Sequence, residues 1–150
     1  MTTPAKYDTA TPYLCAYVML RDGNKIAMVL RTNTGWMDSH WGLLAGKVEK
    51  DETFTQAAIR EAKEEGGVTI KPEDLHLKLI MQRRSDDSDW VNAVFEAKRW
   101  EGQAHNAEPH LHSELGWFDV DDVPENTIPD IKLFLECIQE GKTYLEHGWQ

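Results

Sequence analysis

Three carboxylates, Glu61, Glu64 and Glu65, have the residue type and spacing best suited to chemistry in this sequence. An apolar stripe runs along the same stretch and consists of Phe54, Ala57, Ala58 and Ala62. At about 100° per residue, the angular step of an α-helix, the three carboxylates fall inside the arc of this stripe. The face that the periodicity assigns to the core therefore carries three negative charges.

Clustered carboxylates repel one another and are costly to remove from water. The neighbouring cations, Arg60 and Lys63, are expected to project away from the arc. A hard divalent cation such as Mg²⁺ or Mn²⁺, which prefers oxygen ligands, would keep the cluster ionised. A plain solvated surface is the other interpretation, because glutamate favours helices, and the helix taken alone favours it.

The flanking residues predict the bounds of this helix. Thr53 followed by Gln56 is a capping-box start, and Gly66 with Gly67 provides the backbone freedom that a helix end needs. We expect a helix of about three to four turns between them.

The whole stretch from Gly46 to Val68 fits the pattern G-x5-E-x7-R-E-U-x-E-E-x-G-U, in which U is apolar. The matching residues, in order, are Gly46, Glu52, Arg60, Glu61, Ala62, Glu64, Glu65, Gly67 and Val68. This pattern resembles the signature of the Nudix hydrolase family, of MutT type. The resemblance makes the solvated-surface interpretation a poor one for this stretch.

The resemblance implies a loop-helix-loop box that binds catalytic Mg²⁺ or Mn²⁺ and hydrolyses a nucleoside diphosphate linked to another group. Glu61, Glu64 and Glu65 would be metal ligands, and Glu61 or Glu65 would orient or deprotonate the attacking water. The backbone carbonyl of Ala45 would be a further ligand. Lys47 is placed to meet a phosphate.

The resemblance gives Arg60 and Glu52 a structural role, a pair that fixes the helix against its leading loop. A further ligand or general base often comes from the loop that corresponds to residues 103–115, where Glu108 and Glu114 are the candidates. The stretch 99–102 resembles MutT-type enzymes and favours Glu108 slightly, whereas Ser113-Glu114-Leu115 resembles other members and favours Glu114.

Other residues are candidates for holding the substrate. Arg31 could reach a phosphate, although a surface arginine is the more favoured interpretation. Asn126 and Asp130 precede or open the last helix, where relatives touch the base, and helix capping explains them at least as well. In the loop 32–40, Trp36 and Met37 are equally interpretable as a base-stacking lid or as side chains packed on the sheet edge.

Three histidines of the 103–115 loop, His105, His110 and His112, are interpreted as loop histidines rather than zinc ligands. No regular element or evident carboxylate partner supports a zinc site there.

The pattern of the whole chain predicts strands and a second helix around the box. The expected strands cover residues 13–20, 25–31, 41–44, 68–70, 77–83, 90–100 and 117–120, and the expected helix runs from Pro129 to Gly141. We expect a half-covered strand at 90–100 and no clear pattern beyond 142. The prediction is an α/β fold, the Nudix-like α/β/α sandwich with a mixed sheet, in a single domain over residues 1–150.

The charge and composition of the chain limit the kinds of molecule that it is expected to bind. The formal net charge of −10 argues against a nucleic-acid polymer but leaves room for a small nucleoside diphosphate derivative. No stretch is long enough for a membrane span, and Cys15 and Cys137 are far apart, which favours free thiols in the cytoplasm. A monomer and a homodimer both fit.

The expected activity is Mg²⁺- or Mn²⁺-dependent hydrolysis of a nucleoside triphosphate, including an oxidised or otherwise aberrant one, to the monophosphate and diphosphate. Subfamilies that act on ADP-ribose tend to carry a downstream proline, and those acting on dinucleoside polyphosphates a tyrosine; residues 81–85 contain neither. The alternatives are ADP-ribose or a nucleotide sugar as substrate and, less favoured, a nucleotide-binding module without turnover.

Overall fold

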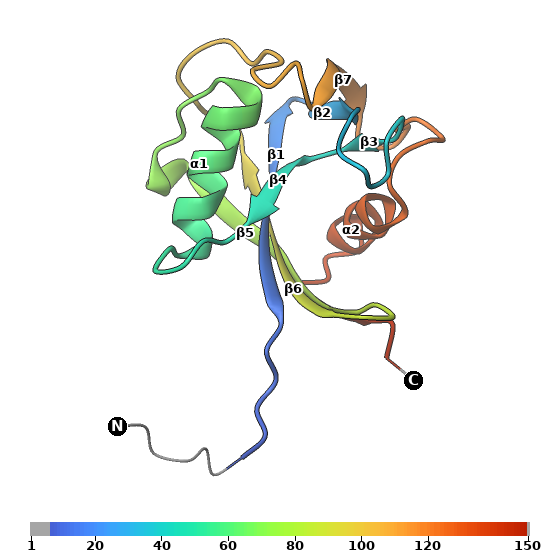
Figure 1. Ribbon diagram of the computed structural model, residues 1–150. Coiled ribbons are helices and arrows are strands. Elements are labelled where there is room, and N and C mark those ends of the chain that lie inside the picture. The colour runs from blue at the N-terminus through green and yellow to red at the C-terminus, as the bar shows by residue number, and fades with distance from the viewer. Residues whose placement is uncertain (1–6, 150) are drawn as a thin grey trace.

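A mixed β-sheet lies between two helices in the computed structural model, which describes residues 7–149 (Figure 1). The elements, in order, are β1 (Tyr13–Asp22), β2 (Lys25–Arg31), β3 (Trp41–Gly42), β4 (Leu44–Lys47), α1 (Phe54–Gly66), the 3₁₀ turn η1 (Pro72–Asp74), β5 (Leu75–Arg84), β6 (Asp89–Ala97), β7 (His112–Asp119), α2 (Pro129–Gln139) and β8 (Tyr144–His147).

The long strand β1 is the centre of the sheet. The strand order is β3-β2-β1-β6-β5-β8, with β4 paired to β1 and β7 paired to β2. Strand β1 is parallel to β6 and antiparallel to β2 and β4. The predicted mixed sheet and α/β/α sandwich are therefore confirmed.

Each face of the sheet is covered by one helix. Helix α1 buries Ala57, Ala58 and Ala62 on one face, and α2 buries Ile131, Phe134 and Leu135 on the other. Burial at about 25 cal/mol per Å² of apolar surface on both faces provides the main drive for folding. Within residues 7–149, neither helix is long and apolar enough to cross a membrane.

The region that leads into the box differs from the prediction. We expected one strand over residues 41–44, but β3 pairs with β2 and β4 pairs with β1, and Leu43 separates them. The break lets the chain pass from one half of the sheet to the other. Strand β4 then brings Ala45 and Gly46 directly beside α1, and the two elements are in contact.

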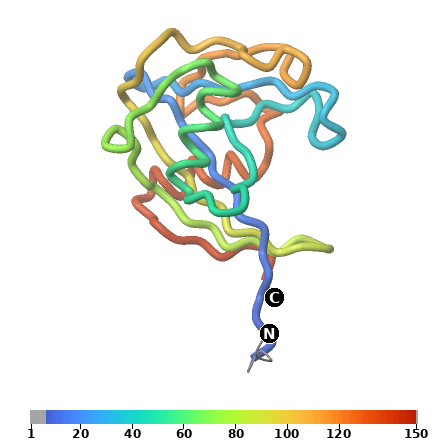
Figure 2. Tube along the Cα trace, turned by 60° about the vertical axis from the view of Figure 1, so that its left-hand side comes forward, coloured from blue at the N-terminus to red at the C-terminus, as the bar shows by residue number. Residues whose placement is uncertain are grey.

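The prediction was also wrong at four other places. Residues 68–70 form only an isolated bridge, between Thr69 and Glu101, instead of a strand. Strand β7 begins at His112, five residues before the expected start at 117. Strand β6 is covered on both faces, so its Asn92 and Glu96 are buried rather than exposed. Strand β8, which was not predicted, runs parallel to β5, and Figure 2 shows it as the red segment beside that strand.

The ends of α1 follow the predicted chemistry. The Thr53 hydroxyl accepts a hydrogen bond from the Gln56 backbone amide, and the Gln56 side chain accepts one from the Thr53 amide, so the capping box is complete. Gly67 ends the helix with φ of 69°, a left-handed conformation that glycine adopts without strain.

A predicted ion pair fixes α1 to the loop before it. Arg60 donates from Nε to Glu52 Oε2 at 2.8 Å and from Nη2 to Glu52 Oε1 at 3.0 Å. Its Nη2 also donates to the Lys47 carbonyl at 3.1 Å. Glu52 in turn accepts from the Glu49 amide, so the Glu52–Arg60 pair ties the loop, β4 and the helix together.

Replacing Glu52 by Gln should lower stability without touching the carboxylates of the helix face. The bidentate charge-assisted pair would be lost, and we expect the free energy of unfolding to fall by about 1 to 2 kcal/mol in urea titrations. The matched control is Glu49→Gln, an exposed neighbour, which should change it by less than about 0.5 kcal/mol. Equal stability of both variants would show that the Glu52–Arg60 pair does not hold the loop.

Candidate active site

Two of the helix glutamates are buried against β4. Glu61 and Glu65 are each 8% exposed, between α1 and the strand. Glu65 Oε1 accepts a hydrogen bond of 2.6 Å from the Ala45 backbone amide. A Cβ atom at Gly46 would lie only 2.0 Å from Glu61 Oε1, so the absent side chain of Gly46 leaves the space that Glu61 fills.

Burial raises the pKa of both carboxyl groups. For Glu61 the pKa rises to about 7, chiefly through loss of water, although hydrogen bonding to Arg60 opposes the rise and the charges of Glu64 and Glu108 add to it. The pKa of Glu65 is raised well above its usual value, again chiefly by burial, and the charges of Glu61 and Glu108 raise it further. Loss of water therefore disfavours the ionised forms of Glu61 and Glu65 more than their neighbours favour them.

One sequence expectation about this charge was wrong. We expected Arg60 to project away from the carboxylates, but its Nη1 lies 2.6 Å from Glu61 Oε1 and 3.3 Å from Glu64 Oε2. A long arginine side chain can reach neighbours at i+1 and i+4 while its other nitrogens hold Glu52. Arg60 therefore compensates part of the cluster, and the raised pKa of Glu61 shows that the compensation is incomplete.

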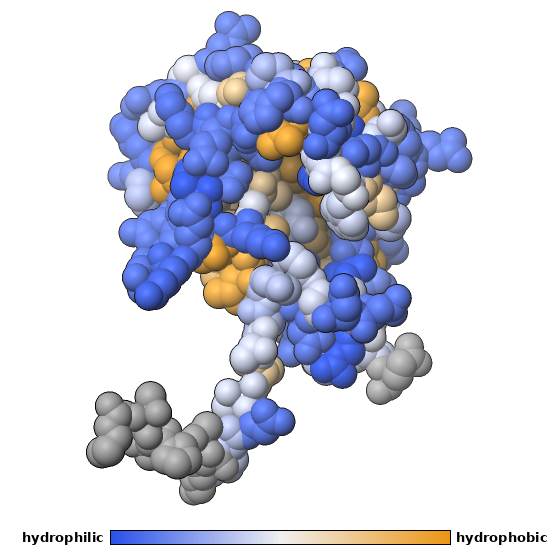
Figure 3. All heavy atoms as spheres, in the orientation of Figure 1, coloured by the Kyte–Doolittle hydropathy of each residue, from blue (hydrophilic) through white to orange (hydrophobic). Residues whose placement is uncertain are grey.

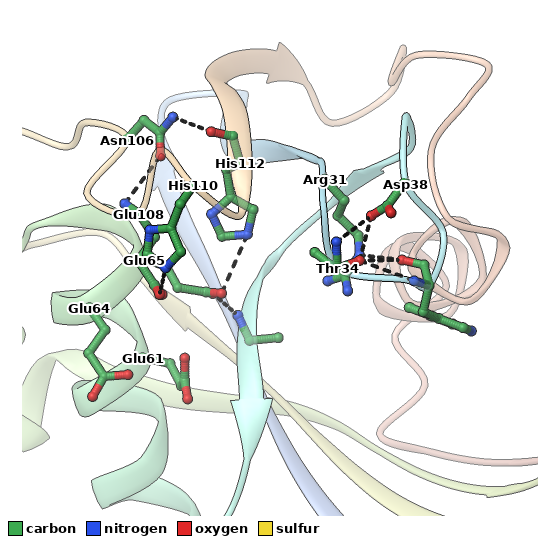
Figure 4. Close-up of polar contacts among 12 residues, drawn as sticks. Arg31, Thr34, Asp38, Glu61, Glu64, Glu65, Asn106, Glu108, His110 and His112 are labelled. Carbon is green, nitrogen blue, oxygen red and sulfur yellow. Dashed lines mark hydrogen bonds and ion pairs between the residues drawn. The ribbon is translucent and has the colours of Figure 1, made fainter.

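The third helix glutamate lies at the edge of the cluster. The Glu64 side chain is 51% exposed and points outward from α1 (Figure 4). Its carboxylate is held by Arg60, with Oε2 3.3 Å from Arg60 Nη1.

A loop before β7 is docked on the end of α1. The amides of Ala107 and His105 donate to the carbonyls of Glu65 and Gly66 at 3.1 and 3.0 Å. These two carbonyls belong to the last turn of the helix, where no helical partner remains. The loop thus satisfies the end of the helix and is held beside the carboxylates.

The loop brings Glu108 to the cluster. Its charge acts on both Glu61 and Glu65, and Asn106 holds its position, because Asn106 Oδ1 accepts from the Glu108 amide and Asn106 Nδ2 donates to the His112 carbonyl (Figure 4). Glu114, the other candidate, lies within β7 and is exposed, between the exposed Ser113 and the half-buried Leu115.

Strand alternation separates Glu114 from the cluster. Leu115 and Trp117 pack against the core on the α1 side, so Glu114 projects from the opposite face of β7. Of the two candidates, the structure brings only Glu108 to the helix glutamates.

The three histidines have different surroundings. His105 packs its ring against Gly67 at the helix end, and His110 lies in the loop, with Nε2 3.9 Å from Glu108 Oε2. His112 corrects the expectation of a loop histidine, because it opens β7 and is 2% exposed. Its Nε2 lies 3.5 Å from Glu65 Oε2, and burial lowers its pKa to about 4, so the ring is neutral.

The chemistry of the donor set fits a hard divalent cation. All the clustered groups are carboxylates, Glu61 and Glu65 are poorly compensated, and an added positive charge would lower their raised pKa values. As the side chains lie, no group of three acidic, histidine or cysteine residues within residues 7–149 is already arranged as an ion cage. Glu61 is turned toward Arg60, and Glu65 toward Ala45 and His112.

The two predicted phosphate-binding cations have other partners in this structure. Arg31 donates from Nε to the Trp36 carbonyl at 2.9 Å and lies 5.2 Å from the Trp36 ring centre. Its charge still acts on Glu65, so it lies near the cluster. Lys47 Nζ lies 4.6 Å from the ring centre of Tyr13 and 5.5 Å from that of Trp90.

The two candidates for a base-stacking lid in the loop of residues 32–40, Trp36 and Met37, lie in different surroundings. Trp36 is 54% exposed and stacks only on Arg31 among the ring contacts of the described residues, whereas Met37 packs on the α2-side core. The Asp38 carboxylate accepts hydrogen bonds from Thr34 and Gly35 and holds the loop in shape. A lid role therefore remains open for Trp36 alone.

Asn126 and Asp130 lie where the chain enters α2, but neither caps the helix. The N-cap is Ile128, with no side-chain capping bond. Asn126 Nδ2 donates to the Ser39 carbonyl at 2.9 Å, and Asp130 Oδ2 lies 2.7 Å from Arg83 Nε. The capping interpretation was wrong for both residues.

The surface is hollowed between the parts that carry α1 and α2. In Figure 3 the hollow shows paler, less hydrophilic residues than the surface around it. A separate open pocket of about 590 Å³ is lined by Tyr13, Arg84 and the turn between β5 and β6, away from the carboxylates. The carboxylate cluster, and not pocket size, identifies the site.

Two residues of the site were missed by sequence reasoning, Asn106 as a loop clamp and His112 as a partner of Glu65. Asn106 stands two residues before Glu108, a spacing typical of a side chain that closes a turn. The early start of β7, which buries His112, left no signal in the sequence pattern.

Comparison with known proteins agrees with this geometry. Residues 12–137 match the family model of the NUDIX domain. The crystal structure of MutT NUDIX hydrolase from Burkholderia pseudomallei is 26% identical and covers 84% of this chain and 97% of its own, with a TM-score of 0.76.

Two curated relatives are similar in sequence. The uncharacterized Nudix hydrolase YvcI of Bacillus subtilis is 28% identical over 87% of this chain and 80% of its own. The oxidized purine nucleoside triphosphate hydrolase of Danio rerio is 32% identical over 60% of this chain and 56% of its own. The chain spans from 22% to 80% of the length of the curated relatives it matches.

The box, the sandwich and the clustered carboxylates thus agree with a family match over most of the chain. The resemblance to MutT-type enzymes that the motif predicted is confirmed, and the chain belongs to the Nudix hydrolase family.

Proposed function

We propose that the protein is an Mg²⁺- or Mn²⁺-dependent pyrophosphohydrolase that cleaves a nucleoside triphosphate, including an oxidised one, to the monophosphate and diphosphate. The observation that carries the proposal is the burial of Glu61 and Glu65 on the face of α1 beside β4, with Glu64 at their edge and Glu108 near enough to raise the pKa of both. Such a site suits a cation and, through it, a polyphosphate.

Glu61, Glu64, Glu65 and the carbonyl of Ala45 would hold the metal, and Glu108 would join them or act as a base. A bound cation would supply charge screening for the phosphates and acidify a water. Glu61 or Glu65 would orient the attacking water, and one carboxylate among Glu61, Glu65 and Glu108 would accept its proton. The water oxygen bonds to phosphorus as the bridging P–O bond breaks, and diphosphate leaves.

Positive side chains would hold the phosphate chain. Arg31 lies near Glu65 and would exchange its contact with Trp36 for a phosphate oxygen. Lys47 would turn from the Tyr13 ring to do the same. Lys47 would replace a weak cation–π contact by a charge-assisted hydrogen bond, and Arg31 would replace a cation–π contact and a hydrogen bond to a neutral carbonyl by one to a charged phosphate oxygen.

Polar groups on the α2 side support a nucleobase as the rest of the substrate. Asn92 is 2% exposed, and its Oδ1 has no partner within the described residues. The Arg83–Asp130 pair lies in the same region, because Arg83 and Asn92 project from the same face of adjacent strands. Asn126 and Asp130 would read the base there, and the name of the Danio rerio relative supports a purine triphosphate.

Replacing Glu61 by Gln should lower turnover by about 10²- to 10⁴-fold while the fold stays intact. The change removes one negative charge and one proton acceptor at nearly constant volume. Steady-state kinetics with circular dichroism as a fold check would measure it. Near-normal turnover would remove Glu61 from the proposed role.

The variants Glu108→Gln and Glu114→Gln distinguish the two loop candidates, and we expect the larger loss of turnover for Glu108→Gln.

Replacing Gly46 by Ala should affect activity more than stability. The new Cβ would overlap Glu61 Oε1, and the flexible carboxylate would move aside rather than the backbone. A displacement of about 1 Å can cost about 10²-fold in turnover, and we expect a loss of that order with a melting temperature close to wild type. Unchanged turnover would mean that the position of Glu61 beside Gly46 is not the productive one.

The identity of the products tests the substrate class. Nucleoside triphosphates, ADP-ribose and nucleotide sugars are incubated with Mg²⁺ and with Mn²⁺, and the products are identified by mass. We expect diphosphate from at least one triphosphate. A sugar phosphate instead would establish the nucleotide-sugar or ADP-ribose alternative, and binding without turnover would support the non-catalytic module.

A further inference from the structure

His112 lies directly behind the carboxylate cluster. It opens β7, pairs with Arg31 of β2 just after an irregularity in the ladder, and is 2% exposed. Figure 4 shows its ring pointing from β7 toward Glu65 on α1. The imidazole ring is therefore buried between β7 and α1, the helix that carries the clustered glutamates.

The two oxygens of Glu65 are held from two sides. Oε1 accepts from the Ala45 amide at 2.6 Å, and Oε2 lies 3.5 Å from His112 Nε2. An ionised carboxylate accepts hydrogen bonds and does not donate them, so with Glu65 ionised this contact favours the tautomer with the proton on Nε2. A gap of 3.5 Å closes to a hydrogen bond with a small movement, as polar contacts in unliganded sites often do.

Packing alone does not explain a histidine at this position. His112 Nδ1 is buried and has no hydrogen-bond partner within residues 7–149. An unsatisfied buried polar atom costs free energy, and an apolar side chain of similar size would avoid that cost. A role for Nε2, which faces Glu65, would offset this cost and would explain why the side chain is an imidazole.

We propose that His112 is a positioning residue for Glu65: its Nε2–H fixes one carboxylate oxygen, while the Ala45 amide fixes the other. The inference rests on the proposed function, in which Glu65 holds the metal. Partners behind a ligand typically change metal affinity or activity by about 10- to 100-fold when they are removed.

The loop that carries Glu108 is linked to the same residue. Asn106 Nδ2 donates to the His112 carbonyl at 2.7 Å, and the His112 amide donates to the Glu108 carbonyl at 2.9 Å. The start of β7 thus holds the Glu108 loop through its backbone and Glu65 through its side chain. His112 sets the spacing of two carboxylates that come from different elements.

Titration with Mg²⁺ alone, by calorimetry and without substrate, tests this role. His112→Leu keeps an apolar body and removes the donor, and we expect it to weaken Mg²⁺ binding by about 10- to 100-fold. His112→Gln, whose amide nitrogen can replace Nε2, should restore most of the affinity. His76→Leu, an exposed histidine on β5, is the control and should bind as the wild type does.

Stability without metal separates positioning from packing. In the presence of chelator, His112→Leu should unfold close to the urea concentration of the wild type, because removal of the unsatisfied Nδ1 offsets the loss of a donor to Glu65. Equal Mg²⁺ affinity of His112→Leu and wild type would overturn the proposal. So would a Gln variant as weak as the Leu variant, since shape alone would then account for the effect.

The ring tautomer gives a second readout that needs neither a variant nor a metal. Nitrogen-15 shifts of His112 in the metal-free protein, recorded at alkaline pH so that Glu65 is ionised, should show the proton on Nε2, and a proton on Nδ1 would overturn the proposal. Failure of the wild type to bind Mg²⁺ would instead contradict the proposed function, while the tautomer would still decide whether His112 donates to Glu65.

Discussion

Burial of negative charge on one face of α1 is the constraint on which the site depends. Glu61 and Glu65 occupy positions that helical periodicity assigns to the core, and each is 8% exposed. Ionised carboxylates are stable in such a place only with compensating partners. Arg60 and the Ala45 amide provide part of the compensation, and the raised pKa values show the remainder that a cation would provide.

Strand β4 and the loop before β7 bring residues that are distant in the sequence to this face of α1. The break at Leu43 turns β4 toward β1, so that Ala45 and Gly46 meet the buried carboxylates. The loop before β7 bonds to the last carbonyls of α1 and thereby delivers Glu108. Each of these elements satisfies an exposed backbone group of another, so the site is assembled by ordinary hydrogen bonding.

Local patterns predicted what depends on neighbours in sequence, and failed where partners are distant. The capping box and both helices follow from short-range spacing, and the Glu52–Arg60 pair was implied by the resemblance of the motif. The contact of Arg60 with Glu61, the burial of His112 and the edge strand β8 depend on side-chain reach or on pairing with remote strands. Glu108 lies in the loop docked on α1 and Glu114 lies within β7, a division that depends on where β7 begins and that the sequence pattern did not specify.

The most direct test of the account is the position of a bound metal. Crystals soaked in Mn²⁺ and measured at its absorption edge should give an anomalous peak bounded by Glu61, Glu65 and the Glu108 loop, with Arg60 displaced from Glu61. A peak elsewhere on the protein, or none at saturating Mn²⁺, would contradict the claim that these carboxylates are clustered to hold a cation.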